Sequence, residues 1–290
     1  HIIIMQNKIV NSINKDLNIL TKKKFSKKYI SKYILPIIDN IANSKHKKIL
    51  ISGSQGIGKS TLLKIIEKNI LKFYEKKILT LSLDDYYLPK KERWILSKKI
   101  HPLLITRGVP GTHDLNKLIK DINSFQNKKY PIHKPIFDKL KDDRSKKKEK
   151  IIQKADILIL EGWCCGSPPI EKKYLYKNIN LLEKKEDPHM IWRNFYNQKL
   201  KNEYSNLFKL FEKKIFLKSS SFNYVLNWRF KQEKMMRKRN NKKIMNKKEL
   251  EYFISHYEKI TKFMIRVLPK RADIVIKIDK NQRIKNLIYN

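Results

Sequence analysis

Cysteine is almost absent from this 290-residue chain, which has only two, Cys164 and Cys165, side by side. Adjacent cysteines rarely reach the geometry of a disulfide, and no CxxC or Cys/His cluster is present to bind a metal. The pattern therefore excludes a disulfide-rich fold and a zinc site built from a CxxC motif or a Cys/His cluster. It fits a reducing compartment, and we expect the cytoplasm or an organelle matrix.

Long apolar runs are lacking too. None approaches the 18 or more residues that a membrane-spanning helix requires, so no membrane partner is expected. Hydrophobic residues nevertheless make up 41% of the chain and aromatic residues 10%, which excludes an intrinsically disordered protein. The length suits one α/β domain with an insertion or two.

Acidic residues are scarce: 27 Asp and Glu stand against 67 Lys and Arg, a formal net charge of +40. Such an excess can indicate a nucleic-acid partner. The lysines, however, are scattered through every segment and form no stripe with interleaved aromatic residues. We therefore expect no nucleic-acid partner, and a nucleic-acid-associated P-loop ATPase is kept only as an alternative. A positive surface would still attract anionic substrates such as ATP or a small carboxylate.

Glycine is also scarce, with seven residues in the chain, yet three of them lie in the segment 53–60, GSQGIGKS. This segment matches the phosphate-binding pattern GxxxxGK[ST] between a predicted strand and a predicted helix. Glycines let the backbone turn its N–H groups toward phosphates, and the helix N-terminus adds positive potential. The predicted nucleotide-binding residues are Gly53, Ser54, Gln55, Gly56, Ile57, Gly58, Lys59, Ser60 and Thr61.

The residue types at the end of this loop predict two specific roles. Lys59 would reach the β- and γ-phosphates of ATP, and the hydroxyl of Ser60 would hold Mg²⁺. The sequence therefore predicts ATP and Mg²⁺ as cofactors.

Short apolar runs alternate with helical patterns along the chain, which predicts a parallel sheet covered by helices on both faces. The runs are 49–52, 78–83, 157–160, 215–217 and 274–278. We expect one α/β domain of the P-loop NTPase type over 1–290, with ligands beyond the carboxyl ends of the strands. Around that core we expect a helical N-terminal extension (1–46), an acceptor-binding insertion (86–150), and a lid with its following helix (222–262).

Three carboxylates follow or end predicted strands. A kinase that acts on a hydroxyl needs one carboxylate to accept the proton and others to organise Mg²⁺. Asp84 is the predicted base and a metal ligand, whereas Asp85 either supports the acceptor and metal or caps the following turn. Glu161 ends a buried strand, where a carboxylate is costly unless it is paired or bound to a metal. We expect it to contact Mg²⁺ through water or to hydrogen-bond Asp84.

Six segments in order resemble the plant- and cyanobacterial-type D-glycerate 3-kinases, of the superfamily of phosphoribulokinase, uridine kinase and pantothenate kinase. They are 53–60, 82–87, 107–115, 135–139, 160–163 and 227–233, within a match that runs from about 48 to 278. The resemblance implies a five-stranded parallel sheet and transfer of the γ-phosphate of ATP to the 3-hydroxyl of D-glycerate. Asp84 matches the catalytic aspartate of the superfamily. A nucleoside, pantothenate or another small alcohol is the alternative acceptor.

Glycerate carries a carboxylate, so its pocket needs cations and hydrogen-bond donors. The candidates for acceptor binding are Asp85, Arg107, His113, Asp114, Lys139 and Arg144, with Arg193 as a further one. Two have a structural alternative: Asp114 as the N-cap of a helix and His113 as a structural residue of a loop. The stretch between Lys139 and Arg144 is shorter than in the family, which leaves the position of Arg144 open.

The predicted lid supplies the last candidates. Phosphoryl transfer develops charge that a cation must neutralise, and an arginine on a closing helix can do so. Arg229 is the predicted catalytic cation and Arg237 the second choice. The alternative is a solvated basic helix without a role in the reaction.

Overall fold

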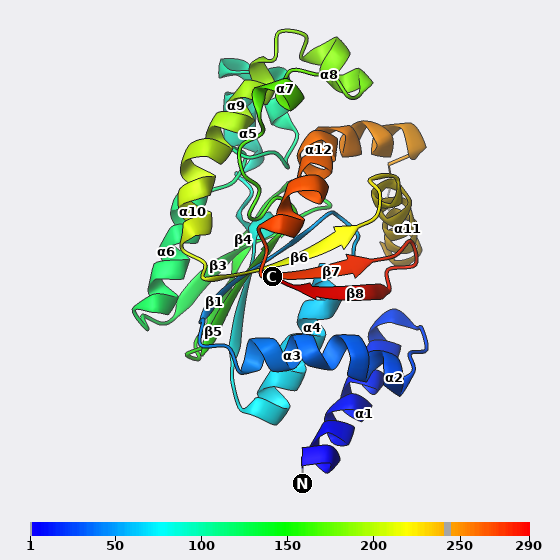
Figure 1. Cartoon of the computed structure of the whole chain (residues 1–290). Coiled ribbons are helices and arrows are strands. Elements are labelled where there is room, and N and C mark those ends of the chain that lie inside the picture. Colours follow the sequence, from blue (N-terminus) through cyan, green and yellow to red (C-terminus); the bar gives the residue numbers. More distant parts are fainter. Residues whose placement is uncertain (1, 241–244) are drawn as a thin grey trace.

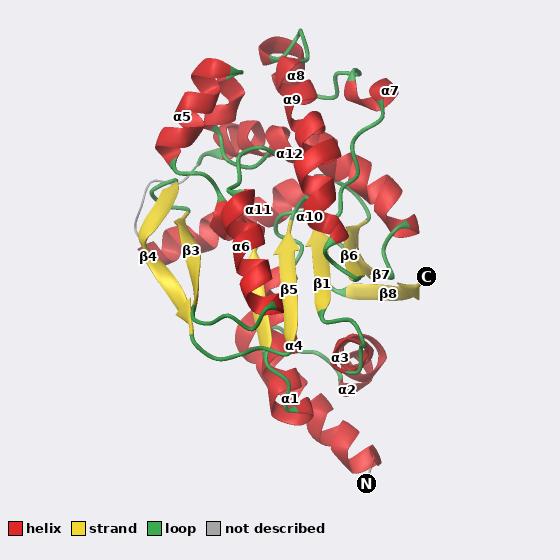
Figure 2. Cartoon of the chain, turned by 90° about the vertical axis from the view of Figure 1, so that its left-hand side faces the viewer, coloured by secondary structure: helices red, strands yellow, loops and turns green. Residues whose placement is uncertain are grey.

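A mostly parallel sheet forms the centre of the protein (Figure 2). The computed structural model describes residues 2–240 and 245–290, and the side chains of 4–234 and 245–290. The strand order is β2-β5-β1-β6-β7-β8, in which β8 alone runs antiparallel to its neighbour. These strands are β1 (Lys48–Gly53), β2 (Ile78–Ser82), β5 (Ile157–Gly162), β6 (Lys213–Ser219), β7 (Ile274–Ile278) and β8 (Ile284–Tyr289).

All five predicted strands are present and parallel, which confirms the predicted fold class. Successive side chains of a strand point to opposite faces of the sheet. Leu50 accordingly belongs to one buried cluster, whereas its neighbours Ile49 and Ile51 belong to the other. Because both faces are buried in this way, the strands are apolar without interruption.

Helices cover both faces of the sheet, as Figure 1 shows. Below it in that view lie four helices, which include the predicted helical extension: α1 (Ile2–Thr21), α2 (Lys27–Tyr29), α3 (Leu35–Ala42) and α4 (Lys59–Tyr74). The remaining helices are α5 (Lys90–Lys99), α6 (Leu115–Gln126), α7 (Lys172–Leu175), α8 (Leu181–Glu186), α9 (Ile191–Lys199), α10 (Ser205–Lys209), α11 (Asn223–Asn240) and α12 (Lys247–Val267). Within the described residues, no helix is both long enough and apolar enough to cross a membrane.

Three strands were not expected from the sequence. A separate hairpin, β3 (Ile132–Asp138) and β4 (Asp143–Ile151), lies within the segment 86–150, and β8 closes the edge of the main sheet. Much of β4 is exposed and its middle is a run of lysines, so it lacks the apolar alternation by which a strand is recognised. β8 has few buried side chains and is defined by its pairing with β7.

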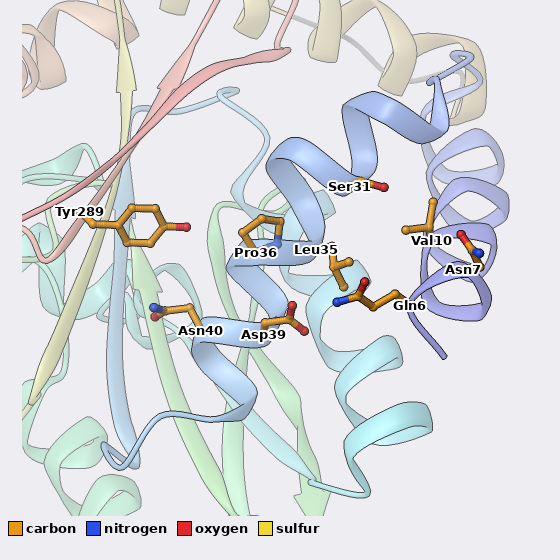
Figure 3. A pocket seen from close by; sticks show the side chains of 9 residues that line it. All are labelled: Gln6, Asn7, Val10, Ser31, Leu35, Pro36, Asp39, Asn40 and Tyr289. Carbon is orange, nitrogen blue, oxygen red and sulfur yellow. The ribbon is translucent and has the colours of Figure 1, made fainter. Parts of the chain in front are cut away.

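A hollow of about 600 Å³ lies between α1, α3 and the end of β8 (Figure 3). Its polar lining includes Gln6, Asp39, Asn40 and Tyr289, but no lysine or arginine. It therefore offers no positive charge to a phosphate. None of its lining residues comes from the loop 53–60.

Candidate active site

The loop between β1 and α4 has the backbone of a phosphate cradle. Gly56 and Gly58 adopt φ angles of 76° and 109°, a region that favours glycine. A Cβ atom at Gly56 would lie 2.7 Å from the Cβ of Trp228, so this position also has no room for a side chain. Gly58 precedes α4 and no side chain caps the helix, which leaves its first amide groups available to an anion.

Lys59 is the first residue of α4, and its ammonium group folds back over the loop. Its Nζ donates hydrogen bonds to the carbonyls of Gly53 (2.7 Å) and Ser54 (3.1 Å). The positive charge is thus held at the mouth of the cradle. This is the position from which a lysine of this motif contacts phosphates.

The ends of β2 and β5 lie beside the phosphate cradle, because the strand order is β2-β5-β1 and the cradle follows β1. Carboxylates lie at or just after both strand ends. Ser82 at the end of β2 is in register with Glu161, and its Oγ donates a 2.6 Å hydrogen bond to Glu161 Oε1. Asp84 and Asp85 follow in a single 3₁₀ turn, Leu83–Tyr86. All four line one cavity of about 300 Å³ together with Lys59 and Ser60.

Asp84 is held as a carboxylate by the groups around it. Its Oδ2 accepts a hydrogen bond from Lys139 Nζ (2.7 Å), and its Oδ1 accepts one from the hydroxyl of Tyr87 (3.2 Å). Burial by itself would raise the pKa of Asp84, but the charge of Lys139, followed by that of Lys59, lowers the pKa well below its usual range. Asp84 is therefore ionised near neutral pH and able to accept a proton.

Asp85 has a different environment. Burial raises its pKa, and the ammonium of Lys134, 4.0 Å away, only partly offsets that effect. Its Oδ1 also accepts a hydrogen bond from the amide of Phe137 on the β3–β4 hairpin. Asp85 thus joins the hairpin to the cavity wall and remains within reach of a ligand.

Arg107 lines the same cavity. Its guanidinium pairs with Asp142 and lies 5.4 Å from each of the ring centroids of Phe137 and Phe253. The hydroxyl of Tyr257 donates a 2.8 Å hydrogen bond to its carbonyl oxygen. These contacts hold a cation in one place, which suits recognition of a carboxylate.

Arg229 enters the same cavity from α11. Its guanidinium donates to Gln232 Oε1 (2.9 Å) and Glu233 Oε1 (2.8 Å) on its own helix. Its Nε has no hydrogen-bond partner among the described residues. Arg237, the second candidate on this helix, falls outside the residues whose side chains are described.

Three predicted acceptor residues, His113, Asp114 and Arg144, do not line this cavity. His113 and Asp114 line a separate cavity of about 310 Å³. His113 stacks on the ring of Tyr87 at 4.4 Å and shares a 2.6 Å hydrogen bond with the hydroxyl of Tyr204. Burial lowers the pKa of His113 to about 3, so the ring is neutral. Asp114 caps α6 by accepting from the amide of Lys117 (3.0 Å). Asp114 also accepts from Arg144, whose other bonds go to backbone carbonyls.

Many of the polar groups of His113, Asp114 and Arg144 therefore bond within the protein, whereas His113 Nε2 and Arg144 Nε have no hydrogen-bond partner among the described residues. Their contact with the acceptor stays a prediction. Arg193 is also placed elsewhere: it is fully buried and its Nε binds Asp187 at 2.8 Å. Lys139 and Arg107, by contrast, do line the cavity.

The sequence missed several residues of the cavity wall: Tyr87, Trp163, Gln232, Phe253 and Tyr257. Tyr87, Trp163 and Gln232 belong to the segments that resemble the kinase family, and this membership could have indicated that they lie near the site. Phe253 and Tyr257 stand four positions apart on α12, a spacing that is equally typical of a helix face packed in a core.

The chain is similar to several known kinases, although no family model matches it. The uncharacterized kinase mug58 of Schizosaccharomyces pombe is 30% identical over 225 residues, which are 71% of this chain and 76% of that protein. The chloroplastic D-glycerate 3-kinase of Arabidopsis thaliana is 26% identical over 250 residues, 78% of this chain but 52% of that protein. The pantothenate kinase of Bacillus velezensis is 27% identical over 149 residues, 51% of this chain and 42% of that protein.

Among solved structures, a D-glycerate 3-kinase from Cryptococcus neoformans has a TM-score of 0.70 with this chain. The match covers 89% of this chain and 96% of that structure, at 24% sequence identity. At this identity the likeness concerns the fold, and it agrees with the predicted P-loop architecture.

Proposed function

Because the chain belongs to the P-loop small-molecule kinases, we propose that it transfers the γ-phosphate of ATP to the 3-hydroxyl of D-glycerate. The observation that carries this proposal is one small cavity with three kinds of group around it. The loop and Lys59 form one side, Asp84 lies beside them, and the cations Arg107 and Lys139 also line it. The similarity to a plant D-glycerate 3-kinase supports the same acceptor.

The donor half of the reaction uses the loop 53–60. Phosphate oxygens would replace the two loop carbonyls as partners of Lys59, and the free amides at the start of α4 would bind the same anion. Arg229 would contact the transferring phosphoryl group through its guanidinium.

Ser60, Asp84 and Glu161 have the oxygen donors that would hold Mg²⁺. Magnesium prefers one or two carboxylates together with phosphates and water. Among the residues described, no cluster of three His, Cys, Asp or Glu side chains is arranged to hold a metal. A metal at this place would be held by these oxygens together with the nucleotide, and it would supply positive charge to the triphosphate.

In the acceptor half, the 3-hydroxyl of glycerate would lie against the carboxylate of Asp84. Its oxygen forms a bond to the γ-phosphorus as the bond to the bridging oxygen breaks, its proton passes to Asp84, and ADP leaves with the electron pair. Arg107 and Lys139 would bind the carboxylate of the acceptor. The cavity of about 300 Å³ has to take phosphates as well, so a small acceptor suits it better than a nucleoside.

A coupled assay of ADP release tests the acceptor. D-Glycerate, L-glycerate, pantothenate, uridine and glycerol would be compared with the same protein, and the phosphorylated product would be identified by ³¹P NMR. We expect D-glycerate to give the highest kcat/KM and 3-phosphoglycerate as the product. ADP release with another alcohol, and none with glycerate, would overturn the proposed acceptor.

Replacing Lys139 with alanine should move the acid limb of the pH profile of kcat/KM to higher pH. Lys139 is the strongest of the groups that lower the pKa of Asp84, so its removal raises this pKa, and the base is protonated at higher pH. Loss of substrate binding alone would lower the whole profile without moving the limb. The exposed Lys141→Ala serves as the control, since Lys141 does not line the cavity; an unmoved limb in Lys139→Ala would contradict the role of Asp84.

A further inference from the structure

Another cavity, of about 610 Å³, also adjoins the phosphate loop. Gly56, Gly58 and Thr61 form its border with the loop and with the start of α4. Gly56 and Gln232 line both this cavity and the one that contains Asp84. A single ligand lying across Gly56 can therefore occupy both.

The far wall of this cavity comes from the N-terminal extension. Leu17, Leu20 and Thr21 at the end of α1 contribute to it, as do the rings of Phe25 and Tyr29. Apolar side chains such as Leu62 and Leu217 line the cavity as well. This lining contrasts with the charged cavity beside Asp84, and it suits a flat, weakly polar group.

Hydrogen bonds fasten the extension to the turn between β7 and β8. Lys23 Nζ donates to the carbonyl of Asn281 (2.9 Å), and Arg283 donates to the carbonyl of Lys24 (3.0 Å). The amide of Ile284 donates to the hydroxyl of Tyr29 (2.7 Å). The same turn reaches the phosphate loop, because Gln282 Nε2 donates to the carbonyl of Gly56 (2.5 Å).

The lining of this cavity also includes Lys23, Lys231 and Lys234. Burial lowers the pKa of Lys23, and the nearby charges of Lys231 and Arg283 lower it further. Lys23 and Lys231 both line the cavity, so an anion bound near them would relieve their mutual repulsion. If the nucleoside of a nucleotide lies in this cavity, its phosphates lie where the two cavities meet, near Gly56 and Gln232.

We infer that this cavity holds the base and ribose of the donor nucleotide, so that residues 17–29 of the N-terminal extension form part of the nucleotide site. Phe25 and Tyr29 supply aromatic surface for the base, and base–aromatic stacking is a strong and common contact. The inference rests on the proposed function in one respect, namely that the phosphate donor is a nucleotide. It does not depend on which alcohol accepts the phosphate.

Isothermal titration calorimetry with ADP and with inorganic tripolyphosphate separates the two halves of the site. Phe25→Ala is expected to weaken ADP binding about tenfold or more, while tripolyphosphate binding changes less than about twofold. Lys59→Ala is expected to weaken both ligands, because it acts on the phosphates. Parallel loss of both ligands in Phe25→Ala would place the effect on the phosphate loop and overturn the inference.

A second pair of variants avoids the risk that Phe25→Ala disturbs the fold. Leu20 and Ile19 are adjacent on α1, and their side chains are 44% and 65% exposed. Of these two residues, only Leu20 lines the cavity. Leu20→Asn should weaken ADP several-fold, and Ile19→Asn should leave it unchanged. ADP binding that is unchanged in both Leu20→Asn and Phe25→Ala would also overturn the inference. The titrations contain no acceptor, so failure to phosphorylate glycerate would leave their outcome intact.

Discussion

Replacement of Arg229 by alanine is expected to lower kcat by about 10³-fold or more, the effect that arginines facing a transferring phosphoryl group have elsewhere. The side chain reaches the cavity that holds Lys59 and Asp84, and its Nε has no partner among the described residues. A guanidinium stays charged and offers its donors in a planar fork. It can therefore bind phosphate oxygens as negative charge develops on them.

Single-turnover kinetics with saturating ATP and the proposed acceptor, D-glycerate, would measure this effect directly. Arg229→Lys should recover only part of the rate, because an ammonium provides charge without the fork. Lys247→Ala, a strongly exposed residue at the start of α12, is the matched control for loss of one positive charge. Arg229 also pairs with Glu233, so thermal unfolding of each variant should accompany the kinetics. Unchanged turnover in Arg229→Ala would remove this residue from the mechanism.

Asp84→Asn should lower kcat by about 10²- to 10⁴-fold, the usual contribution of a positioned general base. Asparagine keeps the shape of the side chain and can still bond to Lys139 or Tyr87, but it cannot take the proton of a hydroxyl. The carboxylate is the group that the surrounding charges keep ionised. The loss should therefore appear in the chemical step.

The affinity for ADP separates this effect from damage to the site. It should stay within about twofold of the wild type in Asp84→Asn, since the loop and Lys59 are untouched. Rapid-quench measurement of the phosphorylated product would show whether the chemical step has become slow. A fall in kcat of less than tenfold would contradict the assignment of Asp84 as the base.

Much of the fold and the donor side of the site could be predicted from the sequence, because local rules determine them. The apolar runs of β1, β2, β5, β6 and β7 identify strands buried on both faces. The spacing of glycines before Lys59 identifies the loop, since only that backbone can approach a phosphate closely. The carboxylates of Asp84 and Glu161 lie where neighbouring parallel strands end, which places them together without further information.

The acceptor side could not be predicted in the same way, because distant segments form it. Tyr257 reaches the carbonyl of Arg107 across 150 positions of the chain, and no local pattern encodes that contact. His113 and Arg144 have the chemistry of ligand-binding residues, yet Nδ1 of His113 shares a hydrogen bond with the hydroxyl of Tyr204, and Arg144 donates to the carbonyl of Tyr87. Which polar group is left free for a ligand is decided only after packing has satisfied the others.

The sequence by itself determined that this chain has a parallel α/β core with a phosphate loop, because backbone requirements and apolar periodicity are local properties. Only the tertiary structure decided where the N-terminal extension lies and which side chains line the cavities. β8 has few buried side chains, but its pairing with β7 fixes the turn between these two strands. This turn is hydrogen-bonded both to the N-terminal extension and to the phosphate loop at Gly56. Such contacts depend on the packing of elements far apart in the chain, and this packing follows from the whole fold.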